Sequence, residues 1–361
     1  MAPAQSAVFN INCGDVAQLI NAINTANSNG EADEINLNVD NQINCVYPLT
    51  AADNTTDGAN GLPSITSPIT INGNQSAIRR QDGSELFRIV YVASTGNLTL
   101  RQLSVENGSN NSRKPGEGWW YGGGIFNVGK LTVEKSKIFR NTAISFGGGI
   151  YNRGELTLKR SIISGNTTGW KGGGIYNRTD ACSFYTITIF ITNSTISDNT
   201  AVDGGGVYNE CSIIRFTNST ISMNTAADSG GIYNGDSTIA AFINSTVSGN
   251  TAYLYFGGIY NNNSSATFTN STVSGNITNW WDGSSWKGGG KAVTDWSHLI
   301  AAGGSAECYS YLDASATPAG TTYFYLLEDV NMGGYRTFHW GNIVSATVCQ
   351  DSGGNPQCED E

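Results

Sequence analysis

A short motif that recurs about every 25 residues constrains the fold of this chain more than any other feature. Two or three glycines precede an aliphatic residue, and asparagine follows two positions later, as in GGGIYN. The aliphatic position is occupied by Ile125, Ile150, Ile175, Val207, Ile232 and Ile259. A second motif, typified by NSTISDN, ends at Asn141, Asn166, Asn199, Asn224, Asn250 and Asn276. Units this short cannot bury a hydrophobic face alone, so successive units must stack on one another.

Short alternating runs between the two motifs predict strands. Leu156 and Leu158 in ELTLKRS, Phe216 and Phe268 have the period of two that marks a half-buried strand. No window within the repeat has helical periodicity. One coil of parallel strands per unit, with coils ~4.8 Å apart, is the geometry of a parallel β-helix. The sequence therefore predicts an all-β solenoid.

Asparagine at the end of each glycine motif is expected to form a ladder. These residues should lie above one another at one corner of successive coils. Asparagine tolerates the left-handed backbone conformation, and its amide can hydrogen-bond along the stack. The predicted ladder consists of Asn127, Asn152, Asn177, Asn209, Asn234 and Asn261.

The repeated GGGIYN and NSTISxN motifs resemble a known family. They are similar to right-handed parallel β-helices of bacterial secreted and surface proteins, including the CSLREA or choice-of-anchor proteins. More distantly they resemble chlamydial polymorphic outer-membrane proteins. The resemblance extends upstream through 62–80 and 87–108 and covers about residues 10–290. It implies a single-stranded right-handed β-helix, whereas the family's adhesins and structural proteins imply no common chemistry.

The two ends of the chain differ from the repeat. Residues 1–30 are expected to form a cap with one short amphipathic helix, for which Asp15 is the N-cap and Leu19 and Ile23 lie on the apolar face. Residues 31–290 are the predicted solenoid, and 291–361 a small antiparallel β segment. The run 321–348 resembles the last strands of a fibronectin-type-III-like sandwich. This segment would either pack on the last coil or be completed by a strand from a neighbouring molecule.

Composition excludes several classes of protein. The 361 residues carry a formal charge of -10 and only 13% charged residues, so binding to a nucleic-acid backbone is not expected. No run approaches the ~18–20 apolar residues of a membrane helix. The start resembles a mature N-terminus with an added Met. Together with the cysteine grouping, these features predict a secreted or cell-surface protein.

The seven cysteines contain no C-x-x-C pair, so we expect no structural zinc. Their grouping predicts disulfides between Cys13 and Cys45 and between Cys182 and Cys211. Cys308 would pair with Cys349 or Cys358, which leaves one thiol over.

Candidate catalytic residues are few. The histidines, His298 and His339, lie outside the repeat. DVNMGG (329–334) resembles an incomplete calcium loop and is better explained as a hairpin turn. We expect no cofactor and no metal. Asp203 and Asp228 stand four residues before the aliphatic position in adjacent coils, with Lys171 at the same position one coil back. Either they form a solvated corner or they are a carboxylate pair ~5 Å apart, as in retaining glycosidases.

A row of aromatic residues lies just ahead of the glycine corners. It is interrupted by Val202, Asp203, Ala227 and Asp228, and WKGGG at 286–290 echoes WKGGG at 170–174. Exposed rings in a row suit flat sugar faces or an apolar partner; alternatively the rings fold over the corner and shield the core. The row comprises Trp119, Trp120, Tyr121, Phe146, Trp170, Tyr253, Tyr255, Phe256, Trp280, Trp281 and Trp286.

The functional hypothesis that follows is non-enzymatic: a structural or adhesive β-solenoid that also self-assembles head-to-tail into filaments. A carbohydrate-binding β-helix that uses the aromatic row is the alternative. A polysaccharide lyase or hydrolase dependent on Asp203 and Asp228 is a third. The partners expected are further copies of this chain or a polysaccharide.

Overall fold

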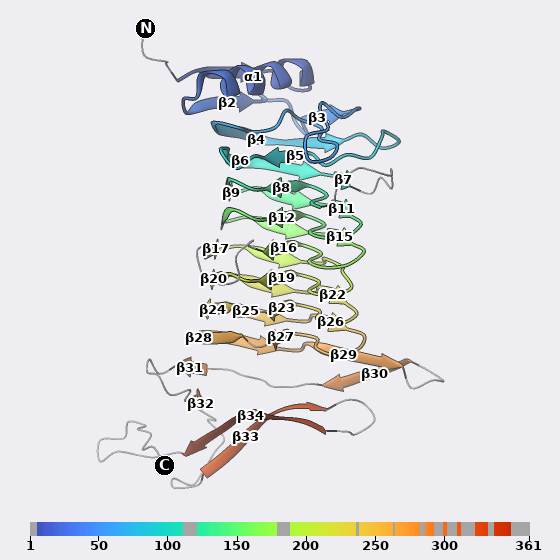
Figure 1. The fold of residues 1–361 in the computed structure, drawn as a ribbon, viewed down its shortest axis with the longest axis vertical. Helices are drawn as coiled ribbons and strands as arrows, with labels where there is room; N and C mark the ends of the chain where they lie inside the picture. Colours follow the sequence, from blue (N-terminus) through green and yellow to red (C-terminus); the bar gives the residue numbers. More distant parts are fainter. Residues whose placement is uncertain are drawn as a thin grey trace, which may run out of the picture.

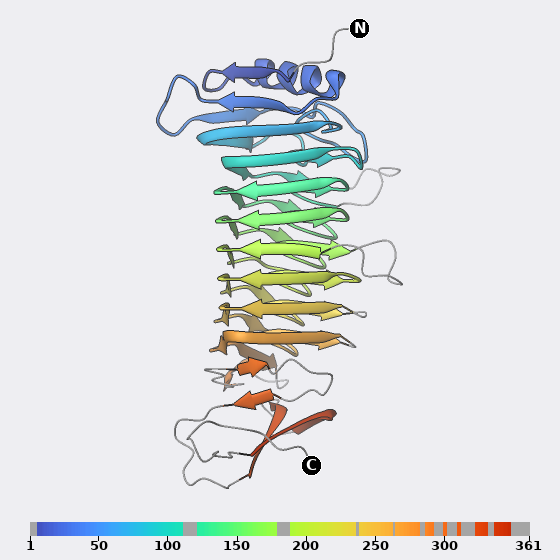
Figure 2. The same ribbon diagram turned by 90° about the vertical axis from the view of Figure 1, so that its left-hand side faces the viewer.

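The computed structural model describes residues 6–110, 121–178, 188–235, 238–262, 264–281, 286–291, 299–301, 309–311, 322–330 and 336–347. Its coils stack along one long axis, with the single helix at the N-terminal end (Figure 1). Figure 2 shows the same strand direction in successive coils. Consecutive coils pair in parallel, as in Ile150↔Ile175 and Leu156↔Leu131. The predicted all-β, right-handed parallel β-helix is confirmed.

The regular coils contribute strands at four positions, although in the coil of residues 188–210 the third position is reduced to isolated bridges at Thr200. The first position holds β9 (Lys130–Glu134), β13 (Glu155–Lys159), β17 (Thr188–Thr192), β20 (Ile213–Thr217) and β24 (Ile239–Ile243). The second holds β10 (Lys137–Phe139), β14 (Ile162–Ser164), β18 (Thr195–Ser197), β21 (Thr220–Ser222) and β25 (Thr246–Ser248). In β4 (Pro68–Arg80), β6 (Asn97–Glu106) and β28 (Ser265–Ser274) one strand spans both positions.

The third and fourth positions complete the coil. The third holds two-residue strands: β7 (Ser109–Asn110), β11 (Thr142–Ala143), β15 (Thr167–Thr168), β22 (Thr225–Ala226) and β26 (Thr251–Ala252). The fourth is a seven-stranded parallel sheet made of β5 (Val90–Val92), β8 (Ile125–Asn127), β12 (Ile150–Asn152), β16 (Ile175–Arg178), β19 (Val207–Glu210), β23 (Ile232–Gly235) and β27 (Ile259–Asn262).

Stacked side chains of one kind fill the interior. Ile125, Ile150 and Ile175 are fully buried, as their position in the repeat predicts. Phe216 and Phe242 stack inside the coil with ring centroids 4.9 Å apart and nearly parallel. Because the coils are in register, each apolar side chain covers the same kind of side chain above and below it, and this contact fixes the register.

Two buried ladders of asparagine run parallel to the axis. In one, Asn127 donates to Asn152 at 2.6 Å and Asn152 to Asn177 at 2.8 Å, and the chain of bonds continues to Asn261. In the other, Asn141 donates to Asn166 at 3.0 Å, and the bonds continue to Asn276. Each amide thus satisfies its neighbour in the next coil, which is why a polar residue is tolerated at a fully buried corner.

The N-terminal end is closed by α1 (Val16–Asn29). Asp15 caps it by accepting from the backbone N–H of Gln18 at 2.9 Å, and Gly30 ends it in the left-handed conformation. Leu19 and Ile23 are fully buried against the first coil. A short strand that the sequence did not predict, β1 (Val8–Ile11), precedes the helix and pairs with β2 (Asp33–Leu37).

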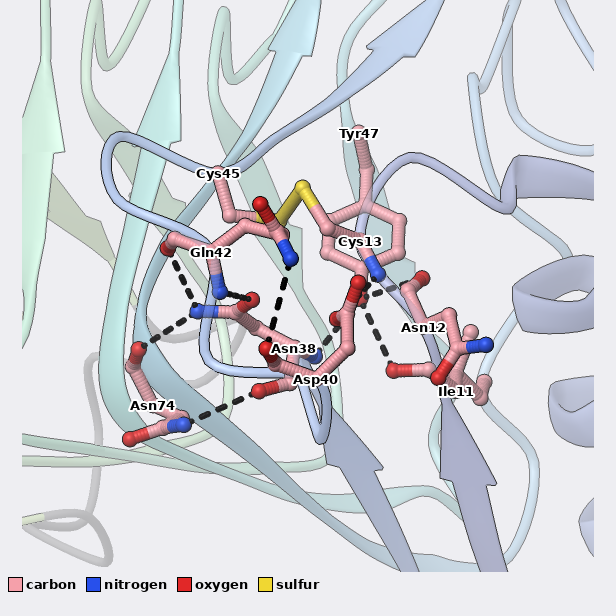
Figure 3. The surroundings of a disulfide bond; sticks show 9 residues. All are labelled: Ile11, Asn12, Cys13, Asn38, Asp40, Gln42, Cys45, Tyr47 and Asn74. Carbon is pink, nitrogen blue, oxygen red and sulfur yellow. Dashed lines mark hydrogen bonds between the residues drawn. A yellow bond between two sulfur atoms is a disulfide. The ribbon is translucent and has the colours of Figure 1, made fainter.

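A disulfide between Cys13 and Cys45 ties this cap to β3 (Val46–Leu49), as Figure 3 shows. Beside it the hydroxyl of Tyr47 accepts from the backbone N–H of Asn38 at 2.7 Å and donates to Asn12 O at 3.0 Å. Cys211 is also in a disulfide bond. Cys182, its predicted partner, and the three C-terminal cysteines lie outside the described residues.

At the other end the last parallel coil is covered by antiparallel strands. β31 (Leu299–Ala301) pairs with β28, and β30 (Trp286–Lys291) with β29 (Ile277–Trp281). β32 (Tyr309–Tyr311) pairs with β31, and β33 (Thr322–Val330) with β34 (Arg336–Thr347). His339 lies on β34, whereas His298 and residues 331–335 of the DVNMGG turn lie outside the described part. Among the described residues, no helix has the length and apolar character needed to span a membrane.

Candidate functional site

The position four residues before the aliphatic position forms one continuous column along an edge of the solenoid. We call it the edge column. Backbone bridges join Tyr121 to Phe146, Phe146 to Lys171 and Lys171 to Asp203. The register of the adjoining strands, with Val207 opposite Ile232, continues the column to Asp228. The edge column comprises Tyr121, Phe146, Lys171, Asp203, Asp228 and Tyr255.

A second column, of aromatic rings, lies beside it. The residue after each buried aliphatic side chain points to the opposite face of the seven-stranded sheet, because side chains alternate along a strand. Tyr151 stacks on Tyr176 at 5.2 Å and Tyr208 on Tyr233 at 4.2 Å between ring centroids. Members of this tyrosine column are Tyr91, Phe126, Tyr151, Tyr176, Tyr208, Tyr233 and Tyr260. This column was not predicted from the sequence, although an aromatic residue follows the aliphatic one in every unit.

Glycine brings the two columns together. Gly172 and Gly204 have φ of 70° and 64°, so the chain turns sharply between the edge column and the sheet. A Cβ on Gly172 would lie 2.7 Å from Cβ of Tyr176, and one on Gly204 would lie 2.9 Å from Cβ of Tyr208. Only glycine permits both the conformation and the close approach. The first glycine of the GGG motif therefore lets the edge column pack closely against the tyrosine column.

The predicted aromatic row divides into two sets. Tyr121 stacks on Tyr151 with centroids 4.3 Å apart, Phe146 lies 4.7 Å from Tyr176, and Phe256 stacks on the ring after Ile259. These rings shield the tyrosine column and are themselves half-buried. Trp119 and Trp120 lie outside the described residues, as do the side chains of the three tryptophans on β29 and β30.

The second set is exposed and forms a ridge. Backbone hydrogen bonds link Val202 N to Trp170 O at 2.8 Å, Ala227 N to Val202 O at 2.9 Å, and Leu254 N to Ala227 O at 2.7 Å. Trp170 is 50% exposed and Leu254 53%. Tyr253 and Tyr255 flank the ridge and are exposed as well. We call Trp170, Val202, Ala227 and Leu254 the exposed ridge. Val202 and the half-buried Ala227 interrupt the row of rings and continue the ridge with aliphatic side chains.

A charged centre lies beside the middle of this ridge. Lys171 donates from Nζ to the hydroxyl of Tyr208 at 2.7 Å. Asp203 in the next coil is only 8% exposed, which corrects the expectation of a solvated corner. Oδ1 of Asp203 and the buried Oγ of Ser229 lack a hydrogen bond of regular geometry, yet the Ser229 hydroxyl is close enough to the carboxyl to lower its pKa. The hydroxyl therefore partly offsets the cost of burying this carboxyl.

The electrostatics make Asp203 an acid near neutral pH. Burial raises its pKa to about 6, against a hydrogen bond from Ser229 that lowers the pKa; the negative charge of Asp228 raises it further, and Lys171 lowers it. Asp228 is half-exposed, and burial raises its pKa as well. The pair is therefore unequal: one carboxyl is held away from water and the other faces it.

The tyrosines of this centre remain protonated. Burial raises the pKa of Tyr176 and of Tyr208, and the negative charge of Glu210 adds to both shifts. Tyr176 donates to Glu210 at 2.7 Å. These phenols can therefore donate hydrogen bonds but cannot act as bases at ordinary pH. Within the described residues, no group of three His, Cys, Asp or Glu side chains is arranged to hold a metal ion.

Comparisons with known proteins identify no family for this chain. No family model matches it, and no curated protein matches it. Among solved structures it is similar to the A-module of the mannuronan C-5 epimerase AlgE4 of Azotobacter vinelandii, with 15% sequence identity and a TM-score of 0.33. The match covers 73% of this chain and 96% of that module. A similarity this low carries no argument about function, and the resemblance to surface β-helix families stays a prediction.

Proposed function

We propose that this protein is a secreted or cell-surface β-solenoid that adheres to a polysaccharide through the exposed ridge and its charged centre. One observation carries the proposal: Trp170, Val202, Ala227 and Leu254 form a continuous apolar line beside Lys171 and Asp203. The disulfide between Cys13 and Cys45 supports an extracellular location, because such bonds persist in oxidising compartments.

The chemistry of the ridge favours sugar over a protein partner. A linear array that repeats at the rise of one coil suits a linear polymer of repeating units. Ring faces such as Trp170 and Tyr255 stack on the apolar faces of sugar rings. Carboxylates, the Lys171 ammonium and tyrosine hydroxyls supply the donors and acceptors that sugar hydroxyls require.

Removing exposed rings tests this proposal. Trp170→Ala combined with Tyr255→Ala should weaken binding to the polysaccharides that the parent retains on a glycan array by tenfold or more, equivalent to about 1.4 kcal/mol. Phe190→Ala is the matched control, since Phe190 is 47% exposed on β17, away from the ridge. Equal losses in both variants, or no retention of any glycan by the parent, would contradict the proposal.

A second candidate function is acid–base chemistry on the bound polysaccharide. A carboxyl with a pKa of about 6 can donate a proton to a leaving oxygen, and Asp228 provides a second carboxylate one coil away. An acid beside a second carboxylate is the pair that glycoside hydrolysis uses, so we expect hydrolysis rather than elimination. We expect reducing ends to appear with neutral or acidic polysaccharides, and Asp203→Asn to abolish them. Unsaturated products, or reducing ends that persist in Asp203→Asn, would refute this role for Asp203.

Head-to-tail assembly into filaments stays a prediction. It requires the C-terminal β segment to accept or contact the next molecule's N-terminal region. Electron microscopy of the purified protein at high concentration should then show filaments, whereas uniform single rods would contradict assembly.

A further inference from the structure

A basic groove lies at a different corner of the solenoid, between the first and second strand positions. It has a volume of ≈ 330 Å³ and runs across four coils. Its lining includes Gln75, Ser76, Gln102, Lys135, Lys137 and Arg160. The exposed ridge lies before the fourth strand position, on another side of each coil. The groove is therefore separate from the surface proposed above.

Charge is concentrated here in a chain that is acidic overall. Arg101 and Arg160 both bind the carboxylate of Glu134, at 3.2 and 2.8 Å. Within the described residues, Lys135 and Lys137 form no ion pair, and Nζ of Lys137 lies 3.8 Å from the ring centroid of Phe139. Three cations, Lys135, Lys137 and Arg160, thus line the groove, and Arg160 is shared with Glu134, although the whole chain has a charge of -10. The nearby Glu106 is already paired with Arg79.

Two of these cations occupy backbone positions with a positive φ, which is unfavourable for long side chains. Lys135 and Arg160 have φ of 49° and 50°, in the left-handed region that long side chains disfavour. The four following coils place asparagine at the same corner with φ of 46° to 49°, at Asn193, Asn218, Asn244 and Asn270. Asparagine is the residue that suits this conformation. In two coils a cation therefore replaces asparagine at this corner, despite the less favourable backbone conformation.

The groove also holds an unsatisfied polar group. Oγ of Ser76 is buried, with the residue 1% exposed, and has no hydrogen-bond partner. Gln75, in the same coil, and Gln102, in the next coil, also line the groove and have positive φ. A ligand that brings hydroxyls as well as negative charge would match this mixture of few cations and several neutral donors and acceptors.

We propose that this groove binds an acidic polysaccharide, with Lys135 and Arg160 contacting its carboxylate or sulfate groups. A nucleic acid fits less well, because its dense phosphate charge would be repelled by the acidic remainder of the chain. Sparse anionic groups on sugar rings suit a few cations beside an otherwise largely apolar lining that includes Leu103 and Ile162. This inference does not depend on the exposed ridge.

The test uses labelled polygalacturonate and dextran sulfate, with unmodified dextran as the uncharged polymer. The full chain should bind both acidic polymers more weakly as salt rises and should not bind dextran through this groove. Lys135→Asn with Arg160→Asn should weaken binding at least tenfold. This variant carries the corner residue that four other coils use, so its thermal stability should equal or exceed that of the parent. Lys130→Gln with Arg215→Gln removes the same charge from exposed strand positions and should change binding less than twofold.

Three further arms separate the explanations. Asn193→Lys with Asn218→Lys extends the cationic corner along the next two coils and should tighten binding. Lys135→Asn with Arg160→Asn should leave unchanged the binding of uncharged polysaccharides that Trp170→Ala with Tyr255→Ala weakens, so the two proposals can fail separately. Sodium sulfate that competes far better than sodium chloride at equal ionic strength would show a site for a lone anion and overturn the inference. So would absent binding by the parent, or equal losses in the test and control variants.

Discussion

At the scale of single residues, charged side chains that the solenoid buries are the most informative. Asp203 and Arg88 are 8% and 0% exposed, although surface charge is the rule for both residue types. Asp203 lies beside the exposed ridge, and Ser229 and Lys171 only partly offset the burial of its carboxyl. Arg88 has three guanidinium nitrogens without a hydrogen bond, and its Cζ lies 5.0 Å from the ring centroid of Phe126. Each should lower the stability of the fold in a measurable way.

Asp203 should make stability depend on pH. Its pKa rises from 3.8 to about 6 on folding, so the folded state binds the proton more tightly. This stabilising contribution is complete below about pH 4 and is lost as pH rises through 6, a change of about 3 kcal/mol. Asp203→Asn should therefore unfold in more urea than the parent at pH 7, with the advantage vanishing toward pH 4. Asp198→Asn, at an exposed carboxylate, is the control; equal pH profiles for parent and Asp203→Asn would contradict this account.

Arg88 should be replaceable by an apolar residue. Burial lowers its pKa to about 10, so the guanidinium stays charged without hydrogen bonds to compensate for desolvation. Arg88→Met should raise the free energy of unfolding by about 1–3 kcal/mol. Arg80→Met should lower it, because Arg80 donates to Asn107 O, Gln81 O and Ser84 O. Urea denaturation checks both, and a loss of stability in Arg88→Met would show that the contacts with Phe126 outweigh desolvation.

At the scale of elements, the corners of each coil contribute more to the stability of the fold than the strands do. Strands of two to five residues gain little from their own propensity, so the buried asparagine ladders and the glycine turns hold them in place. Asn199 shows the density of bonding: its Oδ1 accepts from both the backbone N–H and the amide of Asn166, and its amide donates to Ile163 O and to Asn224.

Asn199→Ala should therefore be severely destabilising. It leaves a buried backbone N–H and a buried carbonyl without partners, each worth about 1–3 kcal/mol. We expect a loss of about 3 kcal/mol or more in urea denaturation. Asn193→Ala, at an exposed corner with φ of 49°, should lose only about 1–2 kcal/mol through backbone conformation. Similar losses in the two variants would show that the ladder adds nothing beyond corner geometry.

At the scale of the whole molecule, the solenoid is a column whose ends need protection. α1 covers one end and the antiparallel strands that follow β28 cover the other (Figures 1 and 2). Covered ends limit the strand edge available for aggregation. The disulfide between Cys13 and Cys45 fastens the N-terminal cap to the second coil.

Removing this disulfide should loosen the cap before the rest. Cys13→Ser with Cys45→Ser should lower stability by about 2–4 kcal/mol, since the bond closes a loop of 32 residues. Hydrogen exchange should accelerate first in residues 6–50 and only later in the regular coils, because each coil contacts only its neighbours. Uniform acceleration along the chain would show instead that the solenoid unfolds as one unit.

The sequence by itself determined the solenoid, its register and its N-terminal cap. A repeat of about 25 residues leaves stacking as the one way to bury Ile125 and Ile150, and Asp15 and Gly30 mark the helix ends. It did not determine which edge residues are buried, because burial depends on contacts between coils. The turn at Gly204 holds Asp203 near Tyr208, which stacks on Tyr176 of the preceding coil. Lys135 and Arg160 line the same groove only because their coils stack. Local pattern fixes how a chain repeats, whereas the lateral packing of distant units decides where charge is desolvated and where it stays available to a ligand.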